Sequence, residues 1–164
     1  GDTCLAENMP GSGAYRPGDV FETYSGKTIE VFSTDAEGRN VLADGLWKAG
    51  EFDPEYIIDL ATLTGAVVVA LGNQITGMWA NDEGIGKRVR KAANRTGESV
   101  WRMPLNAQFR KYMTDSAFAD IRNGSIGGSA GSANTAASFL EYFVPHRGYD
   151  EDADKIPWEF QESM

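Results

Sequence analysis

An alternating strand that runs almost directly into an amphipathic helix is the feature that most constrains this chain. Residues 27–32 alternate apolar and polar side chains, which is the period of a β-strand. Residues 39–49 repeat apolar side chains at the spacing of a helix that packs on one side. We therefore expect a strand over 27–32 and a helix over 39–49, with Gly50 as a left-handed C-cap.

The segments that follow extend this pattern into an α/β fold. Pro54 introduces an apolar run at 56–60, which is typical of a strand covered on both faces of a parallel sheet. Strand, helix and strand together form a βαβ unit. We expect further helices over 66–71, 83–95, 106–113 and 134–143, and further strands over 75–80 and 118–121. The expected fold is an α/β domain with a mixed, mostly parallel sheet flanked by helices.

The residues between the first strand and the first helix allow two interpretations. Ser33, Thr34 and Asp35 are all residue types that cap helices, and an acid at Glu37 suits the helix dipole. A capped helix start is therefore one interpretation. In the other, Asp35 and Glu37 direct their carboxylates to one side, as ligands for Mg²⁺, Mn²⁺ or Zn²⁺. Arg39 would then face an anion beside the metal.

Composition excludes several classes of partner and site. The net charge of −9 argues against a nucleic-acid partner and against an anionic membrane surface. One cysteine, Cys4, and one histidine exclude an internal disulfide and the usual Cys/His zinc cages. The longest apolar stretch, 56–71, contains Asp59, and we expect neither a membrane span nor a signal peptide in this sequence. We expect a cytoplasmic protein, with the basic residues of 83–95 forming a solvated helix face.

Two further stretches carry polar residues in patterns that suggest chemistry. Residues 62–65 follow the 56–60 run, and ligands of open α/β sheets bind at the carboxyl ends of strands, although a simple polar turn is the alternative. Residues 127–131 match the nucleophile-elbow pattern G-x-S-x-G at Ser129. Because a Gly/Ser-rich stretch meets that pattern easily by chance, we expect a structural loop there, with a serine hydrolase as the alternative.

At this point the sequence shows a family resemblance. Residues 33–39, Ser-Thr-Asp-Ala-Glu-Gly-Arg, resemble the signature of the leucyl aminopeptidase (cytosol aminopeptidase) family. The chain is similar to that family, in the same order, at 6–10, 15–19, 59–66, 101–104 and 135–140. The resemblance covers roughly residues 5–144 and corresponds to the C-terminal part of the catalytic domain. Ser33 stands where the family usually has asparagine.

The resemblance implies a two-metal exopeptidase that removes N-terminal residues from peptides. It implies two divalent ions, manganese or zinc, and a bicarbonate that acts as general base, in a homohexameric enzyme. By resemblance, Asp35 and Glu37 are metal ligands and Arg39 is the catalytic residue that holds the bicarbonate. The resemblance also assigns a substrate-binding wall to Thr62, Leu63, Thr64 and Gly65. The family's metal-binding lysine, two aspartates and second catalytic lysine belong to a segment upstream of Gly1, so this chain is expected to carry only part of the site.

The expected domain organisation leaves the role of this chain open. We expect residues 1–144 to form a partial metalloaminopeptidase catalytic domain and residues 145–164 to form an acidic, poorly ordered tail. Besides the aminopeptidase and the serine hydrolase at Ser129, a non-catalytic fragment or subunit that keeps the fold and binds partners is a further hypothesis. Loss of turnover on adding a chelator would distinguish the metal enzyme from both alternatives.

Overall fold

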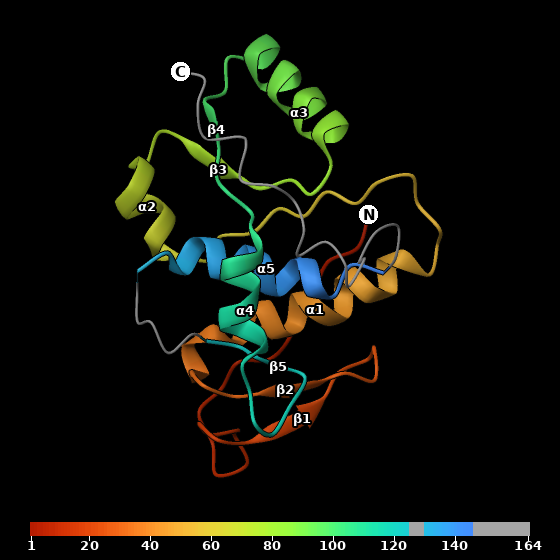
Figure 1. Ribbon diagram of the computed structural model, residues 1–164, viewed down its shortest axis with the longest axis vertical. Coiled ribbons are helices and arrows are strands. Elements are labelled where there is room, and N and C mark those ends of the chain that lie inside the picture. The colour runs from red at the N-terminus through yellow and green to blue at the C-terminus, as the bar shows by residue number, and fades with distance from the viewer. Residues whose placement is uncertain (125–129, 146–164) are drawn as a thin grey trace.

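The computed structural model describes residues 1–124 and 130–145 of the chain (Figure 1). In chain order the elements are β1 (Val20–Glu22), β2 (Thr28–Glu30), the 3₁₀ turn η1 (Thr34–Ala36), α1 (Glu37–Gly50), α2 (Gly65–Leu71), β3 (Thr76–Met78), α3 (Glu83–Thr96), β4 (Val100–Arg102), α4 (Ala107–Thr114), β5 (Ile121–Arg122) and α5 (Ser132–Tyr142). The predicted helices are confirmed to within a few residues at each end.

The strands form two small sheets that lie at opposite ends of the molecule. In the first sheet the order is β1-β2-β5, with β1 antiparallel and β5 parallel to β2. In the second sheet β3 pairs with β4 in parallel. Figure 1 shows α1, α4 and α5 beside the first sheet, whereas α3 lies with the second sheet at the other end. The α/β class with mixed, mostly parallel pairing is confirmed.

The hydrophobic core lies between the first sheet and the helices α1, α4 and α5. Its fully buried side chains are Ile29, Ala43, Met113, Ile121, Phe139 and Phe143. The rings of Phe139 and Phe143 lie 5.1 Å apart between centroids, within the range of favourable aromatic packing. Complete burial of such a side chain contributes about 1.5–3 kcal/mol. This core therefore fixes β2 and α1, the two elements on either side of the acidic segment.

The expected left-handed cap at Gly50 is wrong. Helix α1 continues through Gly50, and its C-cap is Glu51, with a right-handed φ of −62°. Glycine is needed at this position for packing, because a Cβ at Gly50 would collide with the ring of Pro145. The absence of a side chain lets the end of the described chain lie against the end of α1.

The expected strand over 56–60 is also wrong. No residue of this run pairs with another strand in the described part of the chain, so the βαβ unit is not closed through it. The side chains of Ile58 and Leu60 are 55% and 90% exposed. The parallel neighbour of β2 is instead β5, which begins only at Ile121 within the expected 118–121 strand. A strand that is to be covered on both faces needs neighbours, and the described residues provide none here.

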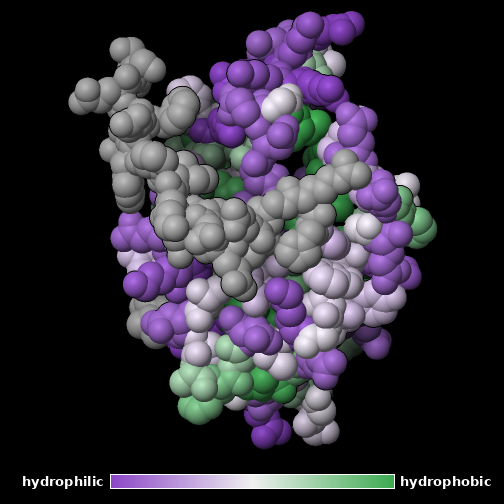
Figure 2. All heavy atoms as spheres, turned by 45° about the vertical axis from the view of Figure 1, so that its right-hand side comes forward, coloured by the Kyte–Doolittle hydropathy of each residue, from purple (hydrophilic) through white to green (hydrophobic). Residues whose placement is uncertain are grey.

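The expected solvated face of α3 is confirmed. Lys87, Arg88, Arg90, Lys91 and Arg95 are all exposed. Figure 2 shows the hydrophilic residues of this helix at the top of the molecule. Among the helices of residues 1–124 and 130–145, none has both the length and the apolar character that a transmembrane span requires.

Candidate active site

The acidic segment forms a tight turn between the core sheet and the first helix. The chain leaves β2, passes through η1 and enters α1 at Glu37. Ser33 is the N-cap of η1 and Ala36 the N-cap of α1, and neither makes a side-chain capping hydrogen bond. The expected side-chain capping is therefore wrong, whereas Glu37 does lie in the first turn of α1, where the helix dipole favours an acid.

The carboxylates of Asp35 and Glu37 are left without polar partners. Asp35 is exposed and Glu37 half-buried, and neither accepts a hydrogen bond or forms an ion pair with another described residue. Carboxylate oxygens of this kind are suitable ligands for Mn²⁺, Zn²⁺ or Mg²⁺. No group of three or more metal-ligating Asp, Glu, His or Cys side chains occurs among residues 1–124 and 130–145. This segment therefore offers two oxygen ligands and not a complete cage.

Arg39 is a buried cation with an unused donor. Arg39 is only 9% exposed, and its Nη1 donates a hydrogen bond to the carbonyl oxygen of Asn123 at 2.8 Å. Its Nε is buried and has no hydrogen-bond partner. Burial lowers the pKa of the guanidinium to about 10, although the charge of Glu37 opposes this shift. Arg39 thus remains charged at neutral pH and can still bind an anion.

The predicted substrate wall lies against the start of α1. Thr64 is the N-cap of α2, and Leu63 precedes it. The Cδ1 atom of Leu63 lies 3.5 Å from the position that a Cβ on Gly38 would occupy. A Cβ at Gly38 would make an ordinary van der Waals contact there, so the turn packs beside the helix end that carries Glu37 and Arg39 whether or not residue 38 has a side chain.

All predicted site residues line one hollow. This open hollow has a volume of about 3520 Å³ and is lined by Asp35, Glu37, Arg39, Thr62, Leu63, Thr64 and Gly65, among others. Large apolar side chains line it as well, including Leu5, Met9, Tyr56, Ile58 and Leu60, each of which is at least 51% exposed. Figure 2 shows hydrophobic residues open to view below α3. This hollow runs along much of the molecule, and within it the packing of Leu63 beside Gly38 is what places the 62–65 turn next to the start of α1.

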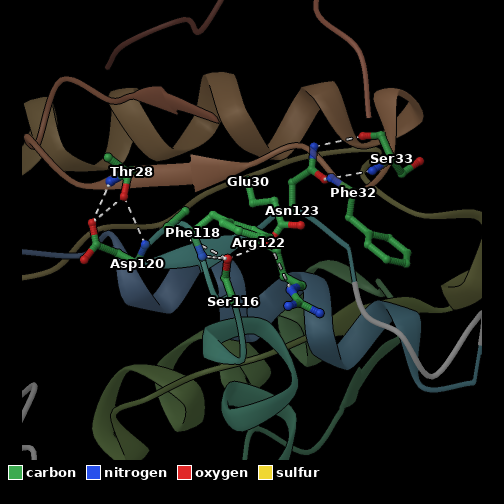
Figure 3. A network of polar contacts seen from close by, with 10 residues as sticks. Thr28, Glu30, Phe32, Ser33, Ser116, Phe118, Asp120, Arg122 and Asn123 are labelled. Atoms are coloured by element: carbon green, nitrogen blue, oxygen red, sulfur yellow. Dashed lines mark hydrogen bonds and ion pairs between the residues drawn. The ribbon is translucent and has the colours of Figure 1, made fainter. Parts of the chain in front are cut away.

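Two residues that contact the segment were not predicted to belong to the site, although Tyr15 lies in the 15–19 stretch that resembles the family. Tyr15 donates a hydrogen bond from its hydroxyl to the carbonyl oxygen of Thr34 at 3.3 Å, and burial together with the charge of Glu37 raises the pKa of this tyrosine. Asn123 binds the backbone of Ser33 with its side chain, as Figure 3 shows. Both contacts join residues that are distant in sequence, so no local sequence pattern predicts them.

The serine-hydrolase alternative cannot be placed on this structure. Ser129 lies outside the described residues, as do residues 146–164 of the expected acidic tail. The interpretation of residues 127–131 as a structural loop and the domain boundary at 144 therefore stay predictions.

Comparison with known proteins identifies the family. Residues 1–159 match the catalytic domain of the cytosol aminopeptidase family. Over 155 residues, the chain is 50% identical to "Probable cytosol aminopeptidase" of Xanthobacter autotrophicus, covering 94% of this chain and 29% of that protein. A protein of the same name from Bradyrhizobium is 52% identical over 141 residues, covering 85% of this chain and 28% of that protein.

A solved structure agrees with these matches. A mutant of tomato leucine aminopeptidase superposes with a TM-score of 0.80 and 45% sequence identity, covering 84% of this chain and 27% of that chain. The chain therefore spans less than a third of the length of the relatives it matches. On the family match, the relatives and the shared fold, this chain belongs to the cytosol aminopeptidase family.

Proposed function

We propose that this chain supplies one wall of the active site of a metal-dependent aminopeptidase that releases N-terminal residues from peptides. The observation that carries the proposal is that unpaired carboxylates and a buried cation lie at the start of α1, where Leu63 of the 62–65 turn packs beside Gly38. The names of the relatives support the reaction class, and membership of the family supports the residue assignments.

Asp35 and Glu37 would hold divalent ions, manganese or zinc, at the start of α1. Their oxygen atoms fit such ions, and no competing cation of the described chain forms an ion pair with them. Two bound ions would polarise the scissile carbonyl and lower the pKa of a water molecule. Because the described residues hold no cluster of three ligands, the remaining ligands would come from a segment outside this sequence.

Arg39 would orient the anion that accepts a proton from the attacking water. Its buried position and free Nε suit a small planar anion such as bicarbonate. Thr62, Leu63, Thr64 and Gly65 would form the wall against which the substrate's N-terminal residue lies. We further propose that the working enzyme is a cytoplasmic homo-oligomer, hexameric as in the family, with no nucleic-acid or membrane partner.

Residues 1–124 and 130–145 contain no three-ligand cluster, which favours one alternative, that this chain by itself is a non-catalytic subunit. A calorimetric titration of the chain with Mn²⁺ tests the ligand assignment. Because catalytic sites usually draw on about three protein ligands per metal, two carboxylates should bind Mn²⁺ more weakly than micromolar. Asp35→Asn and Glu37→Gln should each remove this binding.

Asp120→Asn is the matched control, because Asp120 is an exposed carboxylate that does not line the hollow. It should leave the titration unchanged. Sub-micromolar binding that Asp35→Asn abolishes would show that the chain contains more ligands than we assign. Weak binding that Asp35→Asn and Glu37→Gln leave intact would remove both residues from the site.

A further inference from the structure

One buried asparagine holds both ends of the segment that carries the proposed ligands. Asn123 follows β5 directly and is 0% exposed. Its backbone N–H donates to the carbonyl oxygen of Glu30 at 3.0 Å, which continues the pairing of β5 with β2. The residue is therefore fixed in the core sheet before its side chain makes any contact.

The side chain of Asn123 pairs with the backbone at the start of the segment. Its Oδ1 accepts hydrogen bonds from the N–H groups of Phe32 at 2.8 Å and Ser33 at 3.0 Å. Its Nδ2 donates to the carbonyl oxygen of Ser33 at 2.8 Å. Figure 3 shows the amide directed at this stretch of backbone. These hydrogen bonds hold the chain at the point where it leaves the sheet. Ser33, the N-cap of η1, makes no side-chain capping hydrogen bond that could replace them.

The carbonyl oxygen of the same residue holds the other end. It accepts the hydrogen bond from Nη1 of Arg39, and no other hydrogen bond of the Arg39 side chain to a described residue is present. The neighbouring Gly124 packs against Phe32, since a Cβ there would lie 2.8 Å from Cδ1 of that ring. Asp35 and Glu37 lie between two anchor points that belong to one rigid strand end.

We propose that Asn123 is a positioning residue that sets the places of Asp35, Glu37 and Arg39 relative to one another. The inference rests on the proposed function, because it takes Asp35 and Glu37 as metal ligands. The hydrogen bonds of Asn123 themselves do not depend on a metal. A buried amide whose oxygen and nitrogen both bond to the backbone of one residue, Ser33, fixes the two peptide units on either side of that residue. Partners of this kind, behind the ligands themselves, typically affect metal affinity by about 10–100-fold.

Amide hydrogen exchange of the metal-free chain tests the positioning directly. In Asn123→Ala the Ser33 amide should lose protection by about tenfold relative to the amide of Thr23, which bonds to Lys27 at the far end of the same sheet. The ratio cancels any general loss of stability. Asn123→Asp keeps an acceptor for the Ser33 N–H and should restore the ratio.

Ile121→Val is the matched control, because it weakens the core on the same strand without touching these hydrogen bonds. It should leave the ratio of Ser33 to Thr23 protection unchanged. Should the alanine variant not fold, Asn123→Ser retains a polar group there but is too short for the three bonds. An unchanged ratio in the folded alanine or serine variant would overturn the proposal.

A second readout uses Mn²⁺ itself and separates this inference from the proposed function. Paramagnetic broadening of the Gly38 amide should need about 10–100-fold more Mn²⁺ in Asn123→Ala than in the natural chain, and no more in Ile121→Val. Equal broadening in the natural chain and Asn123→Ala would overturn the positioning role. No broadening in the natural chain would count against the metal site, while the exchange ratio would still decide the role of Asn123.

Discussion

The two halves of this molecule differ sharply in how well they are packed. The half built from β1, β2, β5, α1, α4 and α5 contains the whole hydrophobic core cluster. Between residues 51 and 112, by contrast, only Gly86 and Ala93 are buried, and residues 1–20 are exposed throughout. A hydrogen bond from Nε1 of Trp79 to Oδ1 of Asn134, 2.9 Å long, is one of the links between the halves.

The proposed site residues are divided between these two halves. Asp35, Glu37 and Arg39 belong to the packed half, where Asn123 and the core fix them. The Thr62–Gly65 turn belongs to the open half, where the apolar side chains of the hollow lack cover. Exposed apolar surface on this scale is typical of an interaction site. The packed half holds Asp35, Glu37 and Arg39, whereas the open half leaves apolar side chains exposed.

The largest effect should follow from a cavity in the packed half. Phe139 is 0% exposed and packs against Phe143, so Phe139→Ala should lower the free energy of unfolding by about 3–5 kcal/mol. Chemical denaturation measures this change. The matched variant in the open half is Leu60→Ala, since Leu60 is 90% exposed and should cost no more than about 0.5 kcal/mol. Similar costs for both variants would erase the distinction between the halves.

The smallest effect concerns pH and a surface contact of the packed half. The carboxylate of Asp120 accepts hydrogen bonds from the N–H of Thr28 at 2.8 Å and from its hydroxyl at 2.7 Å, and these lower the pKa of Asp120. A carboxylate with a lowered folded-state pKa stabilises the protein above its unfolded pKa of about 3.9. This stability is lost as the pH falls through the lower folded pKa.

Asp120→Asn should therefore destabilise the chain near neutral pH by less than about 1 kcal/mol, because the group is exposed. The difference between the variant and the natural chain should shrink as denaturation is repeated at lower pH, towards pH 3. A difference that is constant from pH 7 to pH 3 would mean that the ionised carboxylate contributes nothing.

What could be predicted from the sequence depended on whether the signal was local or needed a distant partner. Helices such as α1 and α3 were predicted because their residue pattern is local and repeats within the element. The 56–60 strand was wrong because strand formation depends on partners, which the described chain does not provide. The site residues were assigned by their resemblance to the family. Asn123 was not predicted, because its hydrogen bond to Ser33 joins residues that lie 90 positions apart in the sequence. No periodicity encodes a contact of that kind.

Mutation of Arg39 tests the chemistry once a complete site is available. The guanidinium offers Nε and a planar fork to an anion, whereas a lysine keeps only the charge. In an active assembly, Arg39→Lys should therefore lower kcat more than it raises KM. Steady-state kinetics on a leucyl-peptide substrate measure both constants, and an unchanged kcat would remove Arg39 from the mechanism.

The most direct test of the account is to complete the site. The chain should be mixed with the part of the Xanthobacter autotrophicus relative that precedes its match to this sequence, and hydrolysis of a leucyl-peptide should be followed with Mn²⁺. Neither part alone should be active, because a two-metal site needs ligands around ions about 3.5–4 Å apart. The account predicts that the mixture gains activity, which a chelator or Asp35→Asn abolishes. Full activity of this chain alone, or a bound mixture without any activity, would contradict it.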